Sequence, residues 1–283
     1  MTDAWSPSKR ERERRGIRRR RRLQSVLVAT TLTVVVFAGL GLAIVSSPGW
    51  PSVKDLFFNE FHARESFPAV RDGFWVNVKL FLICEPVILV LGLAVALART
   101  ARSAYLVPVR LLAALYTDVF RGIPTILLVV LLAFGMPALQ LQGIPNSALF
   151  WAGVALVLSY GAYVAEVFRA GIDSIHPSQI ASAEALALSR AQALRFVVVP
   201  QAVRRVLPPL LNDFVSLQKD TALVAAAGIL DAVFAARDYG NFNFNYTPLV
   251  VVACFFIVMT VPLARFTDWL QRRYAERERA GAR

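Results

Sequence analysis

Long apolar stretches recur along this chain, and they constrain its fold more than any other feature. Hydrophobic residues make up 57% of the 283 residues, and charged residues only 18%. A helix of about 20 apolar residues crosses the hydrocarbon core of a bilayer, and soluble domains carry less apolar and more charged sequence. The sequence therefore predicts an all-α integral membrane protein that crosses the bilayer several times.

Six apolar stretches are interpreted as spans, at about 24–45, 74–98, 106–138, 147–168, 207–234 and 248–270. The first is longer than the apolar part of a signal peptide, about 7–15 residues, so we expect a retained helix. The third is expected to be interrupted at Gly122-Ile123-Pro124, because glycine and proline disfavour a continuous helix. Residues 46–72, which contain several prolines, are interpreted as a polar loop.

Basic residues flank these stretches unevenly. The formal net charge is +12, and Arg18-Arg19-Arg20-Arg21-Arg22 ends a basic segment, interpreted as a disordered tail, before the first span. If both termini are cytoplasmic, the arginine-rich segments all lie on the inner side, in agreement with the positive-inside rule. Segment 169–206 is then cytoplasmic as well. Nucleic-acid binding is the alternative explanation of the charge, but no other feature supports it.

Few residues have the chemistry of an enzyme. Cys84 and Cys254 lie within apolar stretches, and His62 and His176 fall on opposite predicted sides of the bilayer. The sequence contains neither a zinc-binding H-E-x-x-H nor a phosphate-binding G-x-x-x-x-G-K-[ST]. We therefore expect no catalytic residue and no bound metal or cofactor. A membrane scaffold or sensor is a further alternative, but it would need neither a folded loop nor an interrupted span.

Segment 169–206 is too long for a simple turn and has the pattern of a folded element. Pro177 suits the first turn of a helix, and Ile180, Ala183, Ala187 and Leu188 follow at helical spacing. A second helical segment, 191–196, is expected before Val197-Val198-Val199-Pro200. Two short helices would then lie at the inner membrane surface. Periodicity alone does not distinguish a docking element for another protein from an interfacial helix pair without a partner.

This loop resembles the EAA loop of bacterial ABC importer permeases, E-A-A-x-x-x-G and, nine residues later, I-x-L-P. The matching positions are Ala181-Ser182-Ala183, Ala187 and Val197-Val198-Val199-Pro200, with Ala181 in place of glutamate and Ala187 in place of glycine. The flanks are similar to the branch that serves histidine, glutamine, glutamate and arginine. They include Glu166-Val167-Phe168-Arg169-Ala170-Gly171-Ile172, Ser216-Leu217-Gln218-Lys219-Asp220-Thr221-Ala222-Leu223 and Phe120-Arg121-Gly122-Ile123-Pro124. The resemblance covers about 73–270.

The resemblance implies a type I ABC importer transmembrane domain, with a five-helix core and one extra N-terminal helix. Residues 1–22 would form a basic cytoplasmic tail, and 23–72 the extra transmembrane helix with an outer loop. Residues 73–270 would form the permease domain, with the coupling loop at about 169–206, and 271–283 a second basic cytoplasmic tail. The implied location is the bacterial cytoplasmic (plasma or inner) membrane.

The implied function is that of a permease subunit that translocates a polar amino acid and is not itself an enzyme. ATP and Mg²⁺ would be used by a separate ABC ATPase subunit. The other implied partners are a second permease subunit, identical or related, an extracytoplasmic substrate-binding protein and membrane lipid, without nucleic acid. The alternative is an ABC permease for another small solute, such as an opine, a compatible solute or a sulfur compound.

The resemblance and the cost of polar groups inside spans together select three sets of residues. The expected ATPase-coupling residues, several of them small enough to let a partner approach closely, are Ala181, Ser182, Ala183, Glu184, Ala187, Leu188, Ser189 and Pro200. The expected substrate-pathway residues are Asn212, Ser216 and Asp220. The structural or gating residues are Asp118, Arg121, Gly122, Pro124, Glu166, Arg169 and Lys219. Arg121 is expected to pair with Asp118, and Glu166 with Arg169.

Overall fold

The computed structural model describes residues 8–101 and 103–281, and every regular element within these ranges is helical. The chain divides into two compact units, residues 1–55 and 56–283. The first unit contains α1 (Lys9–Val45) and the start of α2 (Trp50–Phe57). The second unit contains the other helices and both hydrophobic core clusters.

Helix α1 joins the basic segment to the first apolar stretch without a break. The hydroxyl of Ser8 caps its N-terminus by accepting a hydrogen bond from the amide of Glu11, at 3.3 Å. Within its own unit, the apolar segment 23–45 is exposed along its length, as expected for a surface that faces lipid. The prediction of a disordered tail is wrong for residues 9–22, because arginine is a strong helix former and nothing interrupts the helix before the span.

Helix α3 (Glu60–Thr100) begins well before the predicted second span. The side chain of Asn59 caps it by accepting hydrogen bonds from the amides of Phe61 and His62, at 3.0 and 3.4 Å. The prediction of a polar loop over 46–72 is therefore wrong, because α2 and the first turns of α3 occupy much of this range. The cap at Asn59 starts the helix upstream of the expected position, and α3 continues through Pro68 although proline disfavours a helix interior.

The predicted interruption of the third stretch is confirmed. A short 3₁₀ turn, η1 (Ala104–Leu106), leads into α4 (Val107–Gly122), and α5 (Thr125–Ala138) leaves α4 at an angle of 103°. Ile123 has extended backbone angles, φ −92° and ψ 129°, because the following proline disfavours helical geometry. The two helices form one broken span or a re-entrant segment.

Helix α6 (Ala148–Asp173) packs closely against α3 through small residues. A Cβ atom on Gly92 of α3 would lie 2.5 Å from Cγ1 of Val164, and one on Gly161 of α6 would lie 2.8 Å from Cδ2 of Leu91. Small residues allow two membrane helices to approach at backbone distance, which increases their van der Waals contact. The pair of α3 and α6 therefore forms the centre of the second unit.

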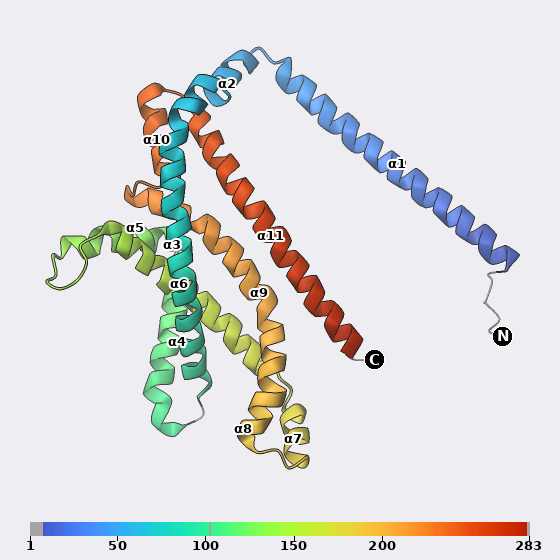
Figure 1. The fold of residues 1–283 in the computed structure, drawn as a ribbon, viewed down its shortest axis with the longest axis vertical. Helices are drawn as coiled ribbons and strands as arrows, with labels where there is room; N and C mark the ends of the chain where they lie inside the picture. Colours follow the sequence, from blue (N-terminus) through green and yellow to red (C-terminus); the bar gives the residue numbers. More distant parts are fainter. Residues whose placement is uncertain (1–7, 102, 282–283) are drawn as a thin grey trace. The chain divides into compact units, whose positions relative to one another are not determined.

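The rest of the chain continues as short and long helices. They are α7 (Pro177–Ala185), α8 (Arg190–Ala193), the π-helical turn η2 (Leu194–Val198), α9 (Val199–Asp220), the 3₁₀ segment η3 (Thr221–Ala227), α10 (Ala232–Asn243) and α11 (Thr247–Gly281). Within the second unit, α7 and α8 lie at one end and α10 at the opposite end (Figure 1). The short helices predicted within 169–206 are thus far from α10.

The prediction of one continuous span over 207–234 is wrong. Helix α9 ends at Asp220, and Gly228 adopts a left-handed conformation with φ 72° after η3. Asp231 then starts α10, because its side chain accepts a hydrogen bond from the amide of Phe234 at 2.8 Å. Among the described residues, four helices are long and apolar enough to cross a membrane, or five if α4 and α5 count as one span.

The main hydrophobic core lies between α3, α5, α6, α9 and η3. Its fully buried side chains include Ile88, Leu156 and Leu217, which come from α3, α6 and α9. A smaller cluster joins α3, α10 and α11 around Val70 and Val252. The buried side chains of these clusters pack closely against one another, and this packing fixes the relative positions of the helices that carry the predicted site residues.

Candidate functional site

Helix α7 ends in a turn that depends on one left-handed residue. Ala187 has φ 57°, a conformation that residues with a Cβ atom seldom adopt. The amide of Leu188 donates to the carbonyl of Ala183 at 3.1 Å, and the amide of Leu186 donates to the carbonyl of Ser182 at 3.2 Å. This is a Schellman-type helix end, which glycine favours. The EAA-loop pattern has glycine at this position, so the structure gives a backbone reason for that residue.

Helix α8 begins at once with a reciprocal cap. The amide of Ser189 donates to Oε1 of Gln192 at 2.8 Å, and the amide of Gln192 donates to the hydroxyl of Ser189 at 3.4 Å. This S-x-x-Q pattern is a capping box, which satisfies two backbone donors at a helix start. Ser189 was predicted from the motif and Gln192 was not, although their S-x-x-Q spacing is that of a capping box.

The predicted coupling residues differ in how far they are exposed. Ala181 and Ser182 are exposed on α7, and Ala187, Ser189 and Pro200 are exposed in the segments that follow. Ala183 is only 3% exposed, so its methyl group packs inside the loop and cannot contact another protein. Leu188 is half-buried, and the side chain of Glu184 lies outside the described part of the structure. The surface available to a partner is therefore smaller than expected.

Contacts hold the segment between α6 and α9 to both helices. The guanidinium of Arg205 on α9 donates to the carbonyl of Ser174, at the end of α6. Nε2 of Gln201 donates to Oε1 of Gln179 on α7 at 3.3 Å. Gly171 packs so closely against Val206 that a Cβ atom would overlap it. The segment with α7 and α8, residues 174–198, which we call the coupling hairpin, is thus fixed at both of its ends.

A cluster of charged side chains joins α3, α4 and α6 around Glu166. Oε2 of Glu166 lies 2.7 Å from Nη1 of Arg99 and 3.7 Å from Nη1 of Arg121, and Oε1 contacts Arg169 as expected. Arg99 also donates to the hydroxyl of Thr117 on α4 at 2.9 Å. Glu166 is about one quarter exposed, which strengthens these interactions relative to a fully solvated surface pair.

The expected pair of Arg121 and Asp118 is wrong. Asp118 is exposed, and no ion pair to it occurs within the described residues. Ala113, Thr117 and Arg121 are spaced by four residues and form the stripe of α4 that faces the other helices, which Asp118 does not share. Arg121 also lies over the ring of Tyr163, 5.7 Å from its centroid. The positive charge at the end of α4 is therefore directed toward α6.

The predicted pathway residues form one stripe on α9. Asn212, Ser216 and Asp220 are spaced by four residues; Asn212 is exposed and the other two are half-buried. The hydroxyl of Tyr160 on α6 donates to Oδ2 of Asp220 at 2.7 Å. Lys219, next to this stripe, is exposed. The three predicted residues thus share one stripe of α9, and Tyr160, which was not selected from the sequence, contacts its last member.

Two further carboxylates lie between α3 and α9. Glu85 on α3 and Asp213 on α9 are close enough to interact electrostatically. The rings of Phe81 and Phe214 also join these two helices, with centroids 4.8 Å apart and planes tilted by 60°. Oδ2 of Asp213 is buried and has no hydrogen-bond partner within the described part of the chain. A buried acceptor without a donor is costly, so it attracts a polar or cationic group. Only the positions of Glu85 and Asp213 inside apolar stretches signal them in the sequence.

A buried polar contact joins α3 to the start of α10. Nδ2 of Asn77 donates to Oδ2 of Asp231 at 2.9 Å, and Oδ1 of Asn77 accepts from the amide of Ala232 at 3.2 Å. Asn77 is 2% exposed and Asp231 fully buried. Because Gly73 of α3 touches the Asp231 backbone, the two elements approach without an intervening side chain. Neither Asn77 nor Asp231 was selected from the sequence, since their contact joins residues 154 positions apart.

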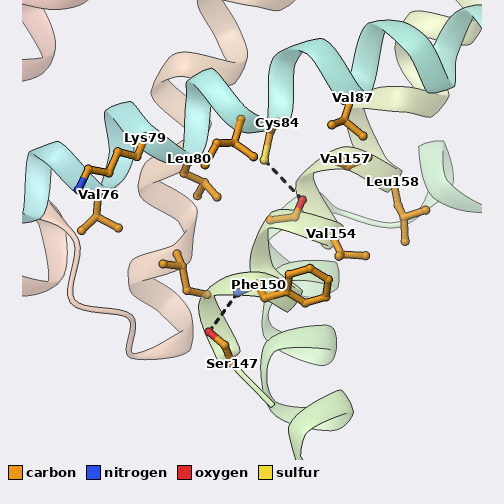
Figure 2. A pocket seen from close by; sticks show the side chains of 13 residues that line it. Val76, Lys79, Leu80, Cys84, Val87, Ser147, Phe150, Val154, Val157 and Leu158 are labelled. Atoms are coloured by element: carbon orange, nitrogen blue, oxygen red, sulfur yellow. Dashed lines mark hydrogen bonds between the residues drawn. The ribbon is translucent and has the colours of Figure 1, made fainter. Parts of the chain in front are cut away.

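A cavity of about 610 Å³ lies between α3 and the first turns of α6 (Figure 2). Its lining is almost entirely apolar, with Val76, Leu80 and Val87 from α3 and Val154 from α6. Among the lining residues that the structure describes, only Lys79 is charged. A polar solute would leave its own groups without partners there, so the cavity does not suit one. The described residues also contain no group of three or more His, Cys, Asp or Glu arranged for a metal ion.

Comparisons with known proteins agree with this geometry. Residues 77–276 match the family described as the binding-protein-dependent transport system inner membrane component. The arginine transport system permease protein ArtQ of Bacillus subtilis (strain 168) is 30% identical over 207 residues, which cover 73% of this chain and 92% of ArtQ.

Solved structures show the same fold. A crystal structure of an amino acid ABC transporter with histidines has a chain that is 30% identical, with a TM-score of 0.66, covering 74% of this chain and 95% of that chain. An inward-facing structure of the MetNI methionine ABC transporter matches at 19% identity and a TM-score of 0.61, covering 74% and 97%. The fold is that of a type I ABC importer permease, and the chain belongs to the family of binding-protein-dependent transport system inner membrane components.

Proposed function

We propose that this chain is the membrane-spanning permease subunit of an ABC importer that translocates a polar amino acid, driven by a separate ATPase subunit. The observation that carries the proposal is the coupling hairpin. Its two helices are capped individually and attached to the ends of α6 and α9. A rigid element held in this way can pass a displacement from a soluble partner to two membrane helices.

The docking surface for the ATPase is the exposed part of the hairpin. Ala181 and Ser182 present small side chains on α7, and Ala187 and Ser189 lie in the turn that follows. Small exposed residues allow the backbone of a partner to approach closely. Glu184 and Leu188 complete the surface proposed from the motif, and Pro200 lies in the first turn of α9.

Movement of the hairpin would reach the broken span through the Glu166 cluster. Arg169 and Glu166 lie on α6, which leads directly into the hairpin, and Glu166 holds Arg121 at the end of α4. The break at Gly122 and Pro124 follows directly. These residues are the proposed gating elements, together with Lys219 near the end of α9. Asp118, on the exposed side of α4, is proposed to have a structural role.

The polar stripe on α9 is the proposed substrate pathway. A polar amino acid carries an ammonium group and a carboxylate, and Asn212 and Ser216 offer donors and acceptors to both. Asp220, held by Tyr160, offers negative charge to the ammonium group. The names of ArtQ, an arginine transport permease, and of the amino acid ABC transporter structure support an amino acid as the transported solute.

The proposed partners follow from the family. An ABC ATPase subunit would bind ATP and Mg²⁺ in the cytoplasm, and a substrate-binding protein would deliver the solute on the outer side. A second permease subunit, identical or related, would complete the pathway. Both termini and the coupling hairpin would lie on the cytoplasmic side of the bacterial inner membrane, which puts α10 at the outer end of the second unit.

Reconstitution with the ATPase and the binding protein in liposomes tests the proposal. Ala181→Arg should abolish ATPase-driven uptake of labelled amino acid while the protein still inserts and elutes as the wild type does. Ala104→Arg is the matched control, because Ala104 is also exposed but lies in η1, outside the hairpin. Equal uptake by the wild type and by Ala181→Arg would refute the docking surface.

A further inference from the structure

Helix α1 carries arginines on all of its sides directly before its apolar stretch. Residues 18–22 are five consecutive arginines, and residues 23–45 that follow are predominantly apolar. Successive residues in an α-helix are rotated by about 100°, so five of them cover the whole circumference. The described arginines among them, Arg18, Arg20, Arg21 and Arg22, are exposed. We call residues 18–22 the arginine collar.

The apolar stretch and the collar of α1 match in length the hydrocarbon core and one headgroup layer of a bilayer. Residues 23–45 are about 34 Å long at a rise of about 1.5 Å per residue, and the hydrocarbon core is about 30 Å thick. The collar is about 7.5 Å long, and the headgroup layer on each side is about 5–7.5 Å thick. Because α1 is continuous from Lys9 to Val45, filling the core with residues 23–45 puts the collar at the level of the lipid phosphates.

The charge of the collar is left uncompensated in the part of the chain that the structure describes. No ion pair involves Arg18, Arg20, Arg21 or Arg22 within the described residues, whereas Arg15 further out pairs with Glu11 at 3.1 Å. A helix that lies flat on a membrane needs an apolar face, and five arginines in a row leave none. The collar therefore surrounds an upright helix. Guanidinium groups bind phosphate oxygens through two parallel hydrogen bonds, which makes lipid phosphates their natural partners at this depth.

We propose that the arginine collar binds anionic phospholipid headgroups and enriches such lipids around α1. The inference goes beyond transport and does not depend on the solute, the ATPase or the side of the membrane that the collar faces. Nucleic acid could also attract this charge, but the collar is continuous with a bilayer-length apolar helix, which favours lipid. The experiment includes nucleic acid as one of its outcomes.

The test measures lipid enrichment beside the collar in the full chain. Cys254 is exposed and is replaced by serine, whereas Cys84 is buried and does not need replacement. Ser25→Cys, three residues from the collar, then carries a fluorescent donor. The protein is placed in phosphatidylcholine vesicles with a small fraction of acyl-labelled acceptor, either phosphatidylglycerol or phosphatidylcholine. Quenching of the donor reports how often each lipid is its neighbour.

The collar variant replaces residues 18–22 by glutamine. In the parent protein, half-maximal quenching should need roughly tenfold less phosphatidylglycerol than phosphatidylcholine, and the collar variant should lose this preference. The matched control replaces five other basic residues of the same helix by glutamine: Lys9, Arg10, Arg12, Arg14 and Arg15. Arg15 lies about 12 Å along the axis from residue 23, beyond the Debye length of about 8 Å at physiological salt. This control should keep the preference.

Two further outcomes are decisive. Replacement of the collar by five lysines should keep most of the preference, since the attraction depends mainly on charge. An equal preference in the parent protein and the glutamine variant would overturn the proposal, as would a loss with lysine as complete as with glutamine. The proposal is also overturned if the donor shows no phosphatidylglycerol enrichment while a labelled oligonucleotide binds the parent protein and not the glutamine collar variant.

Discussion

Replacement of Ala187 by glycine examines the turn at the end of α7. A residue with a Cβ atom in the left-handed region costs about 1–2 kcal/mol, and Ala187 has φ 57°. Glycine removes this cost but loses about 0.5–1 kcal/mol through the greater freedom of the opened chain. We therefore expect Ala187→Gly to stabilise the turn between α7 and α8 by about 0.5–1 kcal/mol.

The same substitution in the middle of α7 should act in the opposite direction. Ala181 is exposed and lies inside the helix, so Ala181→Gly gains no relief from strain. Glycine in a helix interior costs about 0.8–1.0 kcal/mol relative to alanine. Two alanine-to-glycine changes six positions apart thus have opposite expected signs, and neither adds or removes any side-chain contact beyond one methyl group.

Amide hydrogen exchange over residues 182–193 measures this local stability, because these amides exchange when the hairpin opens. Exchange should become about two- to fivefold slower in Ala187→Gly and about four- to fivefold faster in Ala181→Gly. If Ala187→Gly accelerated exchange as Ala181→Gly does, the backbone at position 187 would not be left-handed, and the explanation of the motif's glycine would be refuted.

Three other substitutions test the remaining contacts. Glu166→Gln removes the carboxylate shared by three arginines, so the midpoint of thermal unfolding in detergent should fall, in line with about 1.5–3 kcal/mol for a hydrogen bond to a charged group. An unchanged midpoint would contradict the role of the cluster. Asn77→Leu keeps the side-chain shape but removes a donor to buried Asp231, and should cost about 1–3 kcal/mol in chemical unfolding; a neutral effect would show that the contact adds nothing. Ser189→Ala should speed amide exchange in α8 in line with about 0.5–2 kcal/mol, and Ser189→Asp should restore it; failure of aspartate to do so would argue against capping.

Local rules explain which parts of the fold could be predicted from sequence. The break after Gly122 and the start of α7 at Pro177 were predicted correctly, because proline acts on its immediate neighbours. The apolar stretches identified α1, α3, α6 and α11, because the length and composition of a span are also local properties of the sequence. The start of α3 was missed, because Asn59 was not recognised as a helix cap between prolines and polar residues.

Contacts between distant segments could not be predicted in this way. Arg121 has Asp118 three residues away, but the fold turns it toward Glu166, 45 positions later. Asn77 and Asp231 meet only because α3 and the start of α10 pack together. The motif identified the coupling segment but not which of its residues are buried, so Ala183 was placed on the docking surface while the structure packs it inside.

Gly92 and Gly161, which have no side chain, determine how α3 and α6 can move relative to each other. Where two helices touch at backbone distance, sliding one past the other would push Val164 or Leu91 into main-chain atoms. We therefore expect α3 and α6 to turn as one body during a transport cycle. Bending is then left to the places where hydrogen-bonded helix already stops, at Ile123 and around Gly228. Distances between spin labels on α3 and α6 should stay constant through the cycle, whereas distances across either break should change.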